Sequence, residues 1–275
     1  MEPGYTLMGI VNVTPDSFSD GGEFLDAGAA IAHAMELEAQ GARILDIGGE
    51  STRPGAEPVS AEEELERVIP VLEGLRRQAR AEISIDTSKA AVARAAVQAG
   101  AAIVNDVSAL RADPEMAGVV ADSGARCCLM HMLGEPRTMQ EHPRYADVVD
   151  DVRAFLHERM EFALSCGIRE ERIILDPGIG FGKSTEHNLE LLMRLPEIAS
   201  LGRPVLIGTS RKSFIGRIIG DAAGGGEPVT TDHRLAGTIA TNVMALERGA
   251  SIFRVHDVAP LRDALSVAAA TLGAA

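Results

Sequence analysis

The sequence predicts an α/β fold in which eight parallel strands alternate with helices. Eight short apolar runs each stop abruptly at small, polar or charged residues, and each interval to the next run is long enough for a helix. Strand and helix in alternation imply parallel strands joined by right-handed crossovers. Eight such pairs close most naturally into a single (β/α)8 TIM barrel with its active site at the C-terminal ends of the strands. A doubly wound open sheet is the alternative that this pattern leaves open.

Length and composition fit one barrel. The chain has 275 residues, and α/β barrels of about 250 residues routinely form one unit. We therefore expect one domain over residues 1–275. The sequence is 46% hydrophobic but holds only seven Phe, two Tyr and no Trp. Val, Ile, Leu, Ala and Met must then build the core, which suits the layered interior of a barrel.

The strands are assigned from run length, chain breakers and apolar periodicity. The clearest run, Leu7 to Val13, stops at the segment Thr14-Pro15-Asp16-Ser17. The expected strands cover residues 6–13, 42–47, 82–86, 102–105, 126–131, 172–176, 204–208 and 251–255. Chemistry-bearing residues gather where these strands end.

Helices are expected in the intervals, which are rich in Ala, Leu, Glu and Arg and carry apolar residues at three- and four-residue spacing. They cover residues 26–40, 61–79, 88–99, 114–122, 145–166, 186–194, 233–248 and 258–271. Ser60 followed by Glu63 is a capping box that opens the second helix. Thr87-Ser88 can cap the third.

Three loops stand out by length or glycine content. Residues 14–25 and 48–60 contain Gly and Pro and join strand ends to helix starts. Barrels place substrates at that rim, so both loops are candidate lids. Residues 221–232 contain three consecutive glycines before a long helix and are interpreted as a linker.

Charge and cysteine content limit the kinds of partner, metal site and cellular location that fit this sequence. The 26 basic and 40 acidic residues give a formal charge of −14, which disfavours nucleic acid and anionic membranes as partners. We find no apolar run of about 18 residues and no targeting signal. Cys127 and Cys128 are adjacent and Cys166 stands alone, so neither a Cys-x-x-Cys metal spacing nor an even disulfide framework is present. A cytoplasmic location fits best.

Polar residues end three of the expected strands. Asp86 ends the third, Asn105-Asp106 the fourth and Asp176 the sixth. A carboxylate can accept two parallel N–H bonds from an aminopyrimidine edge, and an amide can serve a mixed donor and acceptor edge. These positions predict a flat, polar heterocycle as ligand. For each position alone, the alternative that it caps a loop or helix stays open.

A glycine-rich run follows the sixth strand. Residues 176–184 (DPGIGFGKS) resemble a phosphate loop, but Pro177 stands where G-x-x-x-x-G-K-[ST] requires glycine. The G-x-G-x-x-G spacing of dinucleotide binders is also absent. The glycines are better explained by close approach of the backbone to a ligand or a neighbouring loop, with Phe181 as a pocket wall.

Cations are expected to face the same mouth in a strongly acidic protein. The candidates are Arg211, Lys212 and Arg217 after the seventh strand, Arg254 and His256 at the last, and Arg53 after the second, all near Asn12. Guanidinium groups suit phosphate oxygens, so the set predicts an anion site. Salt bridging is the alternative for any single cation and is favoured for Arg217.

Other catalytic chemistries are disfavoured. His131, like His33, His142, His157, His187 and His233, has no ligand partner at zinc spacing, so a structural or surface role is expected. Ser210 lacks the G-x-S-x-G elbow, and no Ser-His-Asp order is found, which argues against a hydrolase triad. A metal-assisted aldolase with Lys212 as its Schiff-base lysine is what the residues alone would leave open.

Six segments, in order, resemble the dihydropteroate synthase family. They are residues 8–22 (MGIVNVTPDSFSDGG), 48–55 (GGESTRPG), 105–106 (ND), 176–183 (DPGIGFGK), 210–213 (SRKS) and 254–257 (RVHD). The resemblance runs from about residue 8 to 258. The sequence differs from the family's usual sequence at Val107-Ser108-Ala109 and at Glu135, and neither is a matched functional position.

The resemblance implies an enzyme that joins p-aminobenzoate to 6-hydroxymethyl-7,8-dihydropterin diphosphate, releasing pyrophosphate and forming 7,8-dihydropteroate in folate biosynthesis. Matched positions imply pterin contacts from Asp86, Asn105, Met130, Asp176, Lys212 and Arg254. They imply a diphosphate site of Asn12, Arg254 and His256, with Asn12 associated with Mg²⁺. They imply p-aminobenzoate contacts from Phe18, Thr52, Arg53, Pro54, Phe181 and Ser213, where sulfonamide drugs compete in the family.

The implied catalytic residues are Asp86, Asp176, Lys212 and Arg254. The family also forms dimers, for which helices 233–248 and 258–271 are the candidates. Two related interpretations remain open. A corrinoid-type pterin-binding methyltransferase shares the Asp and Asn contacts but leaves residues 210–213 unexplained. A non-catalytic paralogue is opposed by the intact lids and anion-site residues. The sequence assigns Lys183 no role beyond neutralising loop carboxylates.

Overall fold

The barrel expected from the sequence is present. The computed structural model describes residues 4–14, 26–51, 57–135 and 138–273, and within them eight parallel strands form one sheet in the order β6-β5-β4-β3-β2-β1-β8-β7. A bridge between Leu175 and Val205 joins the outer strands and closes the barrel. The strands are β1 (Thr6–Asn12), β2 (Ile44–Gly48), β3 (Glu82–Asp86), β4 (Ile103–Asp106), β5 (Arg126–Met130), β6 (Ile173–Asp176), β7 (Leu206–Ile207) and β8 (Ile252–Val255).

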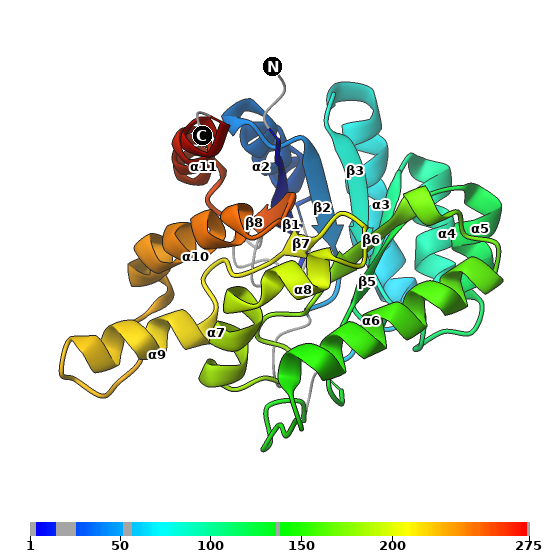
Figure 1. Cartoon of the computed structure of the whole chain (residues 1–275). Helices are drawn as coiled ribbons and strands as arrows, with labels where there is room; N and C mark the ends of the chain where they lie inside the picture. The colour runs from blue at the N-terminus through cyan, green and yellow to red at the C-terminus, as the bar shows by residue number, and fades with distance from the viewer. Residues whose placement is uncertain (1–3, 15–25, 52–56, 136–137, 274–275) are drawn as a thin grey trace.

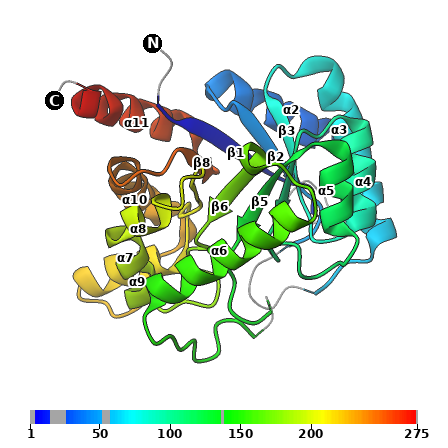
Figure 2. The ribbon, with the colours of Figure 1, turned by 45° about the vertical axis from the view of Figure 1, so that its right-hand side comes forward.

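Helices surround the strands on the outside (Figure 1). They are α2 (Ala27–Gln40), α3 (Ala61–Gln78), α4 (Ala90–Ala99), α5 (Met116–Ser123), α6 (Val148–Ser165), α7 (Thr185–Met193), α8 (Leu195–Ala199), α9 (Ser213–Ala222), α10 (Leu235–Glu247) and α11 (Val258–Gly273), with 3-10 turns η1 (Glu170–Arg172) and η2 (Thr231–Arg234). Figure 2 shows α2 to α5 along one side of the barrel and α7 to α10 along the opposite side. None of the helices that the structure describes is long and apolar enough to cross a membrane.

The seventh strand sector differs most from expectation. The strand expected at 204–208 is reduced to Leu206–Ile207. Pro204 has no N–H to donate to a ladder, and its carbonyl accepts from the Leu175 amide at 2.9 Å. The helix α9 then begins at Ser213, directly after Arg211 and Lys212, and ends at Ala222, inside the segment interpreted as a linker. The sequence analysis missed this helix.

The two expected N-caps differ in outcome. The Ser60 half of the expected capping box is present, because the Ser60 side chain accepts from the Glu63 amide at 3.2 Å, whereas the Glu63 carboxylate accepts from Arg67. The predicted cap of α4 by Thr87-Ser88 is wrong, because the N-cap is Lys89 and makes no side-chain cap bond. Asp113, distant in sequence, instead accepts from the Ala90 amide at 2.9 Å.

The barrel interior begins with an apolar layer drawn from seven strands. It consists of Met8, Ile44, Ile103, Cys128, Ile174, Leu206 and Ile252, all 5% exposed or less. Because alternate residues of a barrel strand face inward, the residue two positions after each of these also faces the interior, nearer the carboxyl end. Cys127 faces the outer core instead, and all three cysteines are free thiols. The apolar layer therefore lies directly beneath the polar residues at the carboxyl ends of the strands.

Candidate active site

Strand register assembles the predicted polar residues at the carboxyl end of the barrel. Asp86 on β3 lies opposite Asn105 on β4, and Met130 on β5 lies opposite Asp176 on β6. All four side chains are buried. The structure thus brings together residues from four neighbouring sectors, with polar groups beside a thioether.

Arg254 is the centre of this group. Its Nε lies 2.6 Å from Oδ2 of Asp46, and its Nη2 lies 2.7 Å from Oδ2 of Asp86. The Asn105 side-chain amide donates to the same Asp46 oxygen at 3.1 Å. Asp46 was not predicted, because it lies inside the apolar run of β2 rather than at its end.

Burial and the nearest opposite charges have opposing effects on the pKa values of Asp86 and Arg254. Burial, reinforced by the nearby Asp46, Glu64 and Asp106, raises the pKa of Asp86 to about 7, although the Arg254 charge lowers it. Burial would lower the pKa of Arg254, but Asp46 and Asp86 outweigh it and raise that pKa. The guanidinium therefore stays charged while Asp86 is poised between its two protonation states near neutral pH.

Asp176 joins the cluster to the glycine-rich loop. Its Oδ1 accepts from the Gly178 amide at 2.7 Å. Burial raises the pKa of Asp176 to about 6, partly offset by that hydrogen bond and by the charges of Lys212, Lys183 and Arg254. Burial thus opposes the ionisation of Asp176 as it opposes that of Asp86.

The loop glycines allow close backbone contacts, as predicted. Gly178 has a φ of +67°, and a Cβ placed there would lie 1.9 Å from the His131 carbonyl oxygen. Gly182 has a φ of +64°, and a Cβ there would lie 2.7 Å from Leu133. Only glycine tolerates both the left-handed backbone and these contacts.

Lys183 fastens this loop from beneath. The side chain is 3% exposed, and its Nζ lies 2.9 Å from the Gly178 carbonyl, 3.0 Å from the Phe181 carbonyl and 2.9 Å from His131 Nδ1. Three acceptors match the three N–H groups of an ammonium. Burial lowers the pKa of Lys183 to about 7, and burial together with the Lys183 charge lowers that of His131 to about 2. His131 is thus structural, as expected.

Lys212 faces the loop from the opposite side. Its Nζ lies 4.0 Å from the centre of the Phe181 ring, a cation–π contact. Lys212 is the N-cap of α9, and the exposed Ser213 follows as the first helical residue. Phe181 is therefore a wall of the mouth with a cation held over one face.

Arg211 departs from the prediction that the cations face one anion. Its guanidinium forms two hydrogen bonds with Asp257, at 2.9 and 2.7 Å. Its φ is +58°, a conformation that is costly for a residue with a Cβ. Arg211 thus ties the turn before Lys212 to the end of β8, and the salt-bridge alternative holds for it.

The expected anion residues lie on neighbouring strand ends. Asn12 ends β1 opposite Gly48. His256 follows β8, and its Nδ1 lies 2.9 Å from Ser210 Oγ. A Cβ placed on Gly48 would lie 3.6 Å from Asp86 Cβ and 3.9 Å from Asn12 Oδ1, so this glycine lies between the two side chains.

An apolar wall at the mouth was only partly foreseen. Met130 packs in a buried cluster with Val107, Met132 and Met139, and Phe181 lies against it. Polarisable thioether side chains suit the face of a planar ring. No single stretch of sequence joins these residues, because they come from the segments that end or follow β4, β5 and β6.

Some of the predicted site residues are not among those that the structure brings together at the mouth. Phe18, Thr52, Arg53 and Pro54 lie outside the described residues. Asp106, grouped with Asn105 in the sequence analysis, turns away from the mouth. Its two oxygens accept from the amides of Ser108 and Leu110, both at 2.8 Å, so it holds the loop after β4.

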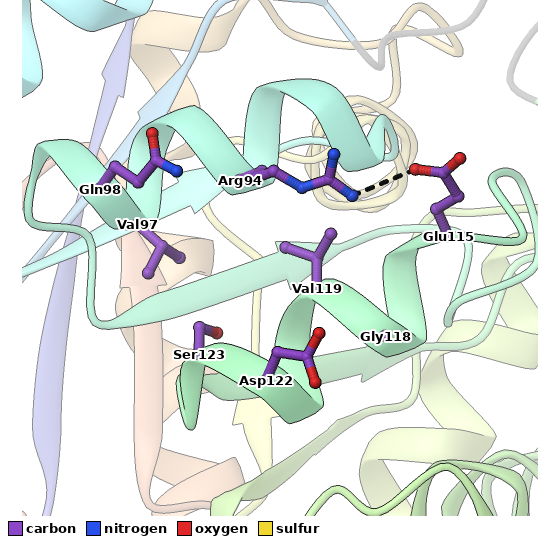
Figure 3. A pocket seen from close by; sticks show the side chains of 8 residues that line it. All are labelled: Arg94, Val97, Gln98, Glu115, Gly118, Val119, Asp122 and Ser123. Atoms are coloured by element: carbon purple, nitrogen blue, oxygen red, sulfur yellow. Dashed lines mark hydrogen bonds and ion pairs between the residues drawn. The ribbon is translucent and has the colours of Figure 1, made fainter.

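A separate groove lies between α4 and α5, on the outer helical layer (Figure 3). Val97 and Val119 line it, and an ion pair between Arg94 and Glu115 spans one end at 3.1 Å. Its residues belong to the helices and their adjoining turns, so it is distinct from the mouth at the strand ends.

A barrel mouth with two buried carboxyls, an amide, clustered cations and an apolar wall defines a class of enzyme that binds a flat polar heterocycle beside an anion. The pterin binding enzyme family matches residues 8–256. The chain belongs to that family.

Similar proteins show which members of the pterin-binding family this chain resembles. Dihydropteroate synthase of Synechocystis sp. is 48% identical over 262 residues, which cover 95% of this chain and 88% of that protein. The structure of Yersinia pestis dihydropteroate synthase with a sulfonamide drug complex has a TM-score of 0.91 at 41% identity, covering 100% and 97% of the two chains. That of Xanthomonas albilineans dihydropteroate synthase with 4-aminobenzoic acid has a TM-score of 0.89 at 50% identity, covering 98% and 93%. Within the pterin-binding enzymes, this chain falls among the dihydropteroate synthases.

Proposed function

We propose that this protein is a transferase of folate biosynthesis that condenses 6-hydroxymethyl-7,8-dihydropterin diphosphate with p-aminobenzoate, giving 7,8-dihydropteroate and pyrophosphate. The observation that carries the proposal is the convergence of Asp86, Asn105 and Asp176 on one mouth around Arg254. The full-length relationship to dihydropteroate synthases supports the same reaction.

The pterin edge is assigned to the buried polar cluster. Asp86 and Asp176 accept from the aminopyrimidine N–H groups, since ionised carboxyls are acceptors only. Asn105 serves a mixed edge, and Lys212 donates to the pterin carbonyl. The Met130 thioether lies against one ring face, and Arg254 lies near the other. Burial supports these roles, because hydrogen bonds strengthen when water is excluded.

The diphosphate is assigned to Asn12, Arg254 and His256. The described residues contain no group of three His, Cys, Asp or Glu side chains that could hold a metal. Mg²⁺ is typically held by one or two protein oxygens together with substrate phosphates, so the single amide oxygen of Asn12 fits a Mg²⁺ that arrives with the diphosphate. Such an ion, when bound, neutralises charge on the leaving group.

The p-aminobenzoate side is assigned to Phe181 and Ser213 with the loop residues Phe18, Thr52, Arg53 and Pro54. Phe181 offers a ring face beside the charge of Lys212. In the sequence, Phe18 follows β1, and Thr52, Arg53 and Pro54 follow β2. A sulfonamide competes with p-aminobenzoate for this side.

The chemistry is a dissociative substitution at the pterin methylene. The methylene–oxygen bond breaks, its electron pair leaves with pyrophosphate, and the pterin becomes cationic. The amine nitrogen of p-aminobenzoate then bonds to the methylene and loses one proton to solvent. Asp86 and Asp176 stabilise the pterin cation, and Arg254 and His256 stabilise the departing anion, each placed where charge develops. Exclusion of water from the mouth is required, because water would otherwise trap the cation.

We also assign the enzyme to the cytoplasm as a single-domain homodimer, with no nucleic acid or membrane partner. Exposed apolar side chains lie on helices away from the mouth, among them Met244 on α10 and Val267 on α11. The packing of α10 against α11 makes one continuous surface for a second copy.

The test is pyrophosphate release by the purified protein with dihydropterin diphosphate and Mg²⁺, with and without p-aminobenzoate, alongside detection of dihydropteroate. Release that depends on p-aminobenzoate and equals dihydropteroate formation is expected. Pterin binding without release would shift the assignment to a methyltransferase or an inactive paralogue, and borohydride trapping on Lys212 would indicate an aldolase.

A further inference from the structure

Asp46 is a charged residue enclosed within the barrel. Its side chain is 0% exposed, and it lies on β2 between the fully buried Leu45 and Ile47. Its Oδ2 is shared by Arg254 Nε at 2.6 Å and Asn105 Nδ2 at 3.1 Å. Two of the groups assigned to substrate thus rest on one carboxylate oxygen beneath the mouth.

Stability alone is a poor explanation for this arrangement. Removing a carboxylate from water is expensive, and well-packed apolar residues often replace buried ion pairs without loss of stability. The second oxygen, Oδ1, has no hydrogen-bond partner among the described residues, so the desolvation cost of Asp46 is only partly compensated. The role of this carboxylate is therefore better explained by its effect on its two partners, Arg254 and Asn105.

The geometry fixes the orientation of both partners. An ionised carboxylate only accepts hydrogen bonds, so the Asn105 amide must turn its NH₂ toward Asp46, which leaves its carbonyl to face the substrate. Arg254 is held at Nε by Asp46 and at Nη2 by Asp86. Two anchors on a planar guanidinium fix its plane as well as its position.

We propose that Asp46 is a positioning residue for the pterin half of the reaction, holding the Arg254 guanidinium and the Asn105 amide in the orientations that bind dihydropterin diphosphate. The proposal rests on the synthase function proposed above. Within the described part of the chain, the hydrogen bonds of Asp46 go to Arg254 and Asn105, and not to Phe181 or Ser213 of the p-aminobenzoate side, so we expect its influence to be confined to one of the two substrates.

Asp46→Asn is the principal variant, since it removes the charge and leaves the side chain nearly the same size. Loss of a group that orients a ligand-binding side chain typically costs 10- to 100-fold, so we expect kcat/KM for dihydropterin diphosphate to fall by about that factor. The KM for p-aminobenzoate, measured with saturating pterin substrate, should stay within about twofold, because the other subsite is untouched.

Ser84→Ala is the matched control. Ser84 lies opposite Asp46 on the neighbouring strand, is equally buried, and its Oγ has no hydrogen-bond partner within the described part of the chain. It therefore reports any general effect of removing a polar group from this layer. Urea unfolding of both variants shows whether the kinetics come from folded protein.

A double-mutant cycle with Arg254→Met separates positioning from general loosening. If Asp46 acts through Arg254, adding Asp46→Asn to Arg254→Met should cost only about threefold or less, the remainder acting through Asn105. Additive losses, equal effects on both substrates, or kinetics matching Ser84→Ala would each overturn the proposal.

The wild type separates this test from the proposed function. Wild-type protein without synthase activity would reject the function itself, whereas an active wild type with an unaffected Asp46→Asn rejects only the positioning role. If Asp46→Asn is not recovered folded, Asp46→Glu keeps the charge but moves the carboxylate against Arg254 and Asn105. The same loss confined to the pterin substrate is expected, and wild-type kinetics would again overturn the proposal.

Discussion

Arg254 Nη2 donates to Asp86 Oδ2 across 2.7 Å, which joins the last strand of the barrel to the third. The carboxyl in this contact has a pKa raised to about 7 by burial. Burial therefore opposes the ionisation of a residue assigned to bind the pterin and stabilise its positive charge.

The first prediction follows from this pKa. The ionised form of Asp86 is the one that accepts from the pterin, so kcat/KM for dihydropterin diphosphate should fall as pH drops through about 7. This parameter reports the free enzyme, and Asp176, with a pKa of about 6, should steepen the fall at lower pH. Asp86→Asn should lower kcat/KM by about 10²- to 10³-fold and remove the limb near 7. A flat wild-type profile between pH 5.5 and 8 would contradict this.

The second prediction concerns Lys212. A hydrogen bond to a charged donor is worth about 1.5 to 3 kcal/mol, so Lys212→Ala should lower kcat/KM for the pterin substrate by roughly 10- to 100-fold. Arg217→Ala, at an exposed position on the same helix, is the control and should retain wild-type rates. Steady-state kinetics of the two variants decide the matter, and equal activity would remove Lys212 from the site.

The third prediction compares two glycines. Gly178→Ala should destabilise the fold by more than about 1 to 2 kcal/mol, because φ is +67° there and the new Cβ would meet the His131 carbonyl. Gly118, within α5, has nothing within 4 Å of the same position, so Gly118→Ala should stabilise by about 0.5 to 1 kcal/mol. Urea unfolding measures both changes, and similar effects would show that the loop can move aside.

The fourth prediction uses the buried lysine. The pKa of Lys183 is lowered to about 7, below its unfolded value, so between pH 7 and 10 the unfolded chain binds more protons. The free energy of unfolding of the wild type relative to Lys183→Met should therefore rise with pH above 7, by up to about 1.4 kcal/mol per unit.

Lys89→Met is the control for this measurement. Burial lowers the pKa of Lys89, but the hydrogen bonds with Glu50 and Glu64 outweigh it and raise that pKa. The stabilisation from Lys89 is therefore fully present below the unfolded pKa of about 10.4 and is lost as pH rises through the higher folded pKa. The difference between wild type and Lys89→Met should be flat from pH 7 to 9. A flat curve for Lys183→Met as well would mean that the Lys183 ammonium is not disfavoured by burial.

The fifth prediction is the dimer. Light scattering should give twice the chain mass, and Val267→Glu on α11, where the side chain is 69% exposed, should reduce the mass toward a monomer by placing charge in the interface. Val97→Glu, on the groove between α4 and α5, should leave the mass unchanged. A monomer mass for the wild type would reject the assignment.

The fold was predictable because barrel strands are nearly uniform apolar runs that stop at polar residues. Asp86, Asn105 and Asp176 were found for the same reason, since each ends a run. Asp46 was missed because it interrupts a run, and an isolated charge between Leu45 and Ile47 carries no strand-end signal. What identifies it is its contact with Arg254, 208 residues away.

Most other differences between the sequence predictions and the structure depend on how residues far apart in the sequence, or on opposite faces of a strand, are placed in space. Arg211 was grouped with the mouth cations, but its bond to Asp257 depends on two loops meeting in space. Asp106 adjoins Asn105, yet alternation along β4 sends the two side chains to opposite faces. The α9 helix was missed because its cationic start was interpreted as a binding segment alone.

The two cysteines of β5 have a practical consequence. Burial raises the pKa of Cys127 to about 12 and that of Cys128 well above its usual range, so neither offers a thiolate to an electrophile at neutral pH. Cys166, at the end of α6, is partly accessible. A maleimide dye should therefore attach at Cys166 alone in the native protein, giving a single fluorescent reporter without any engineered substitution.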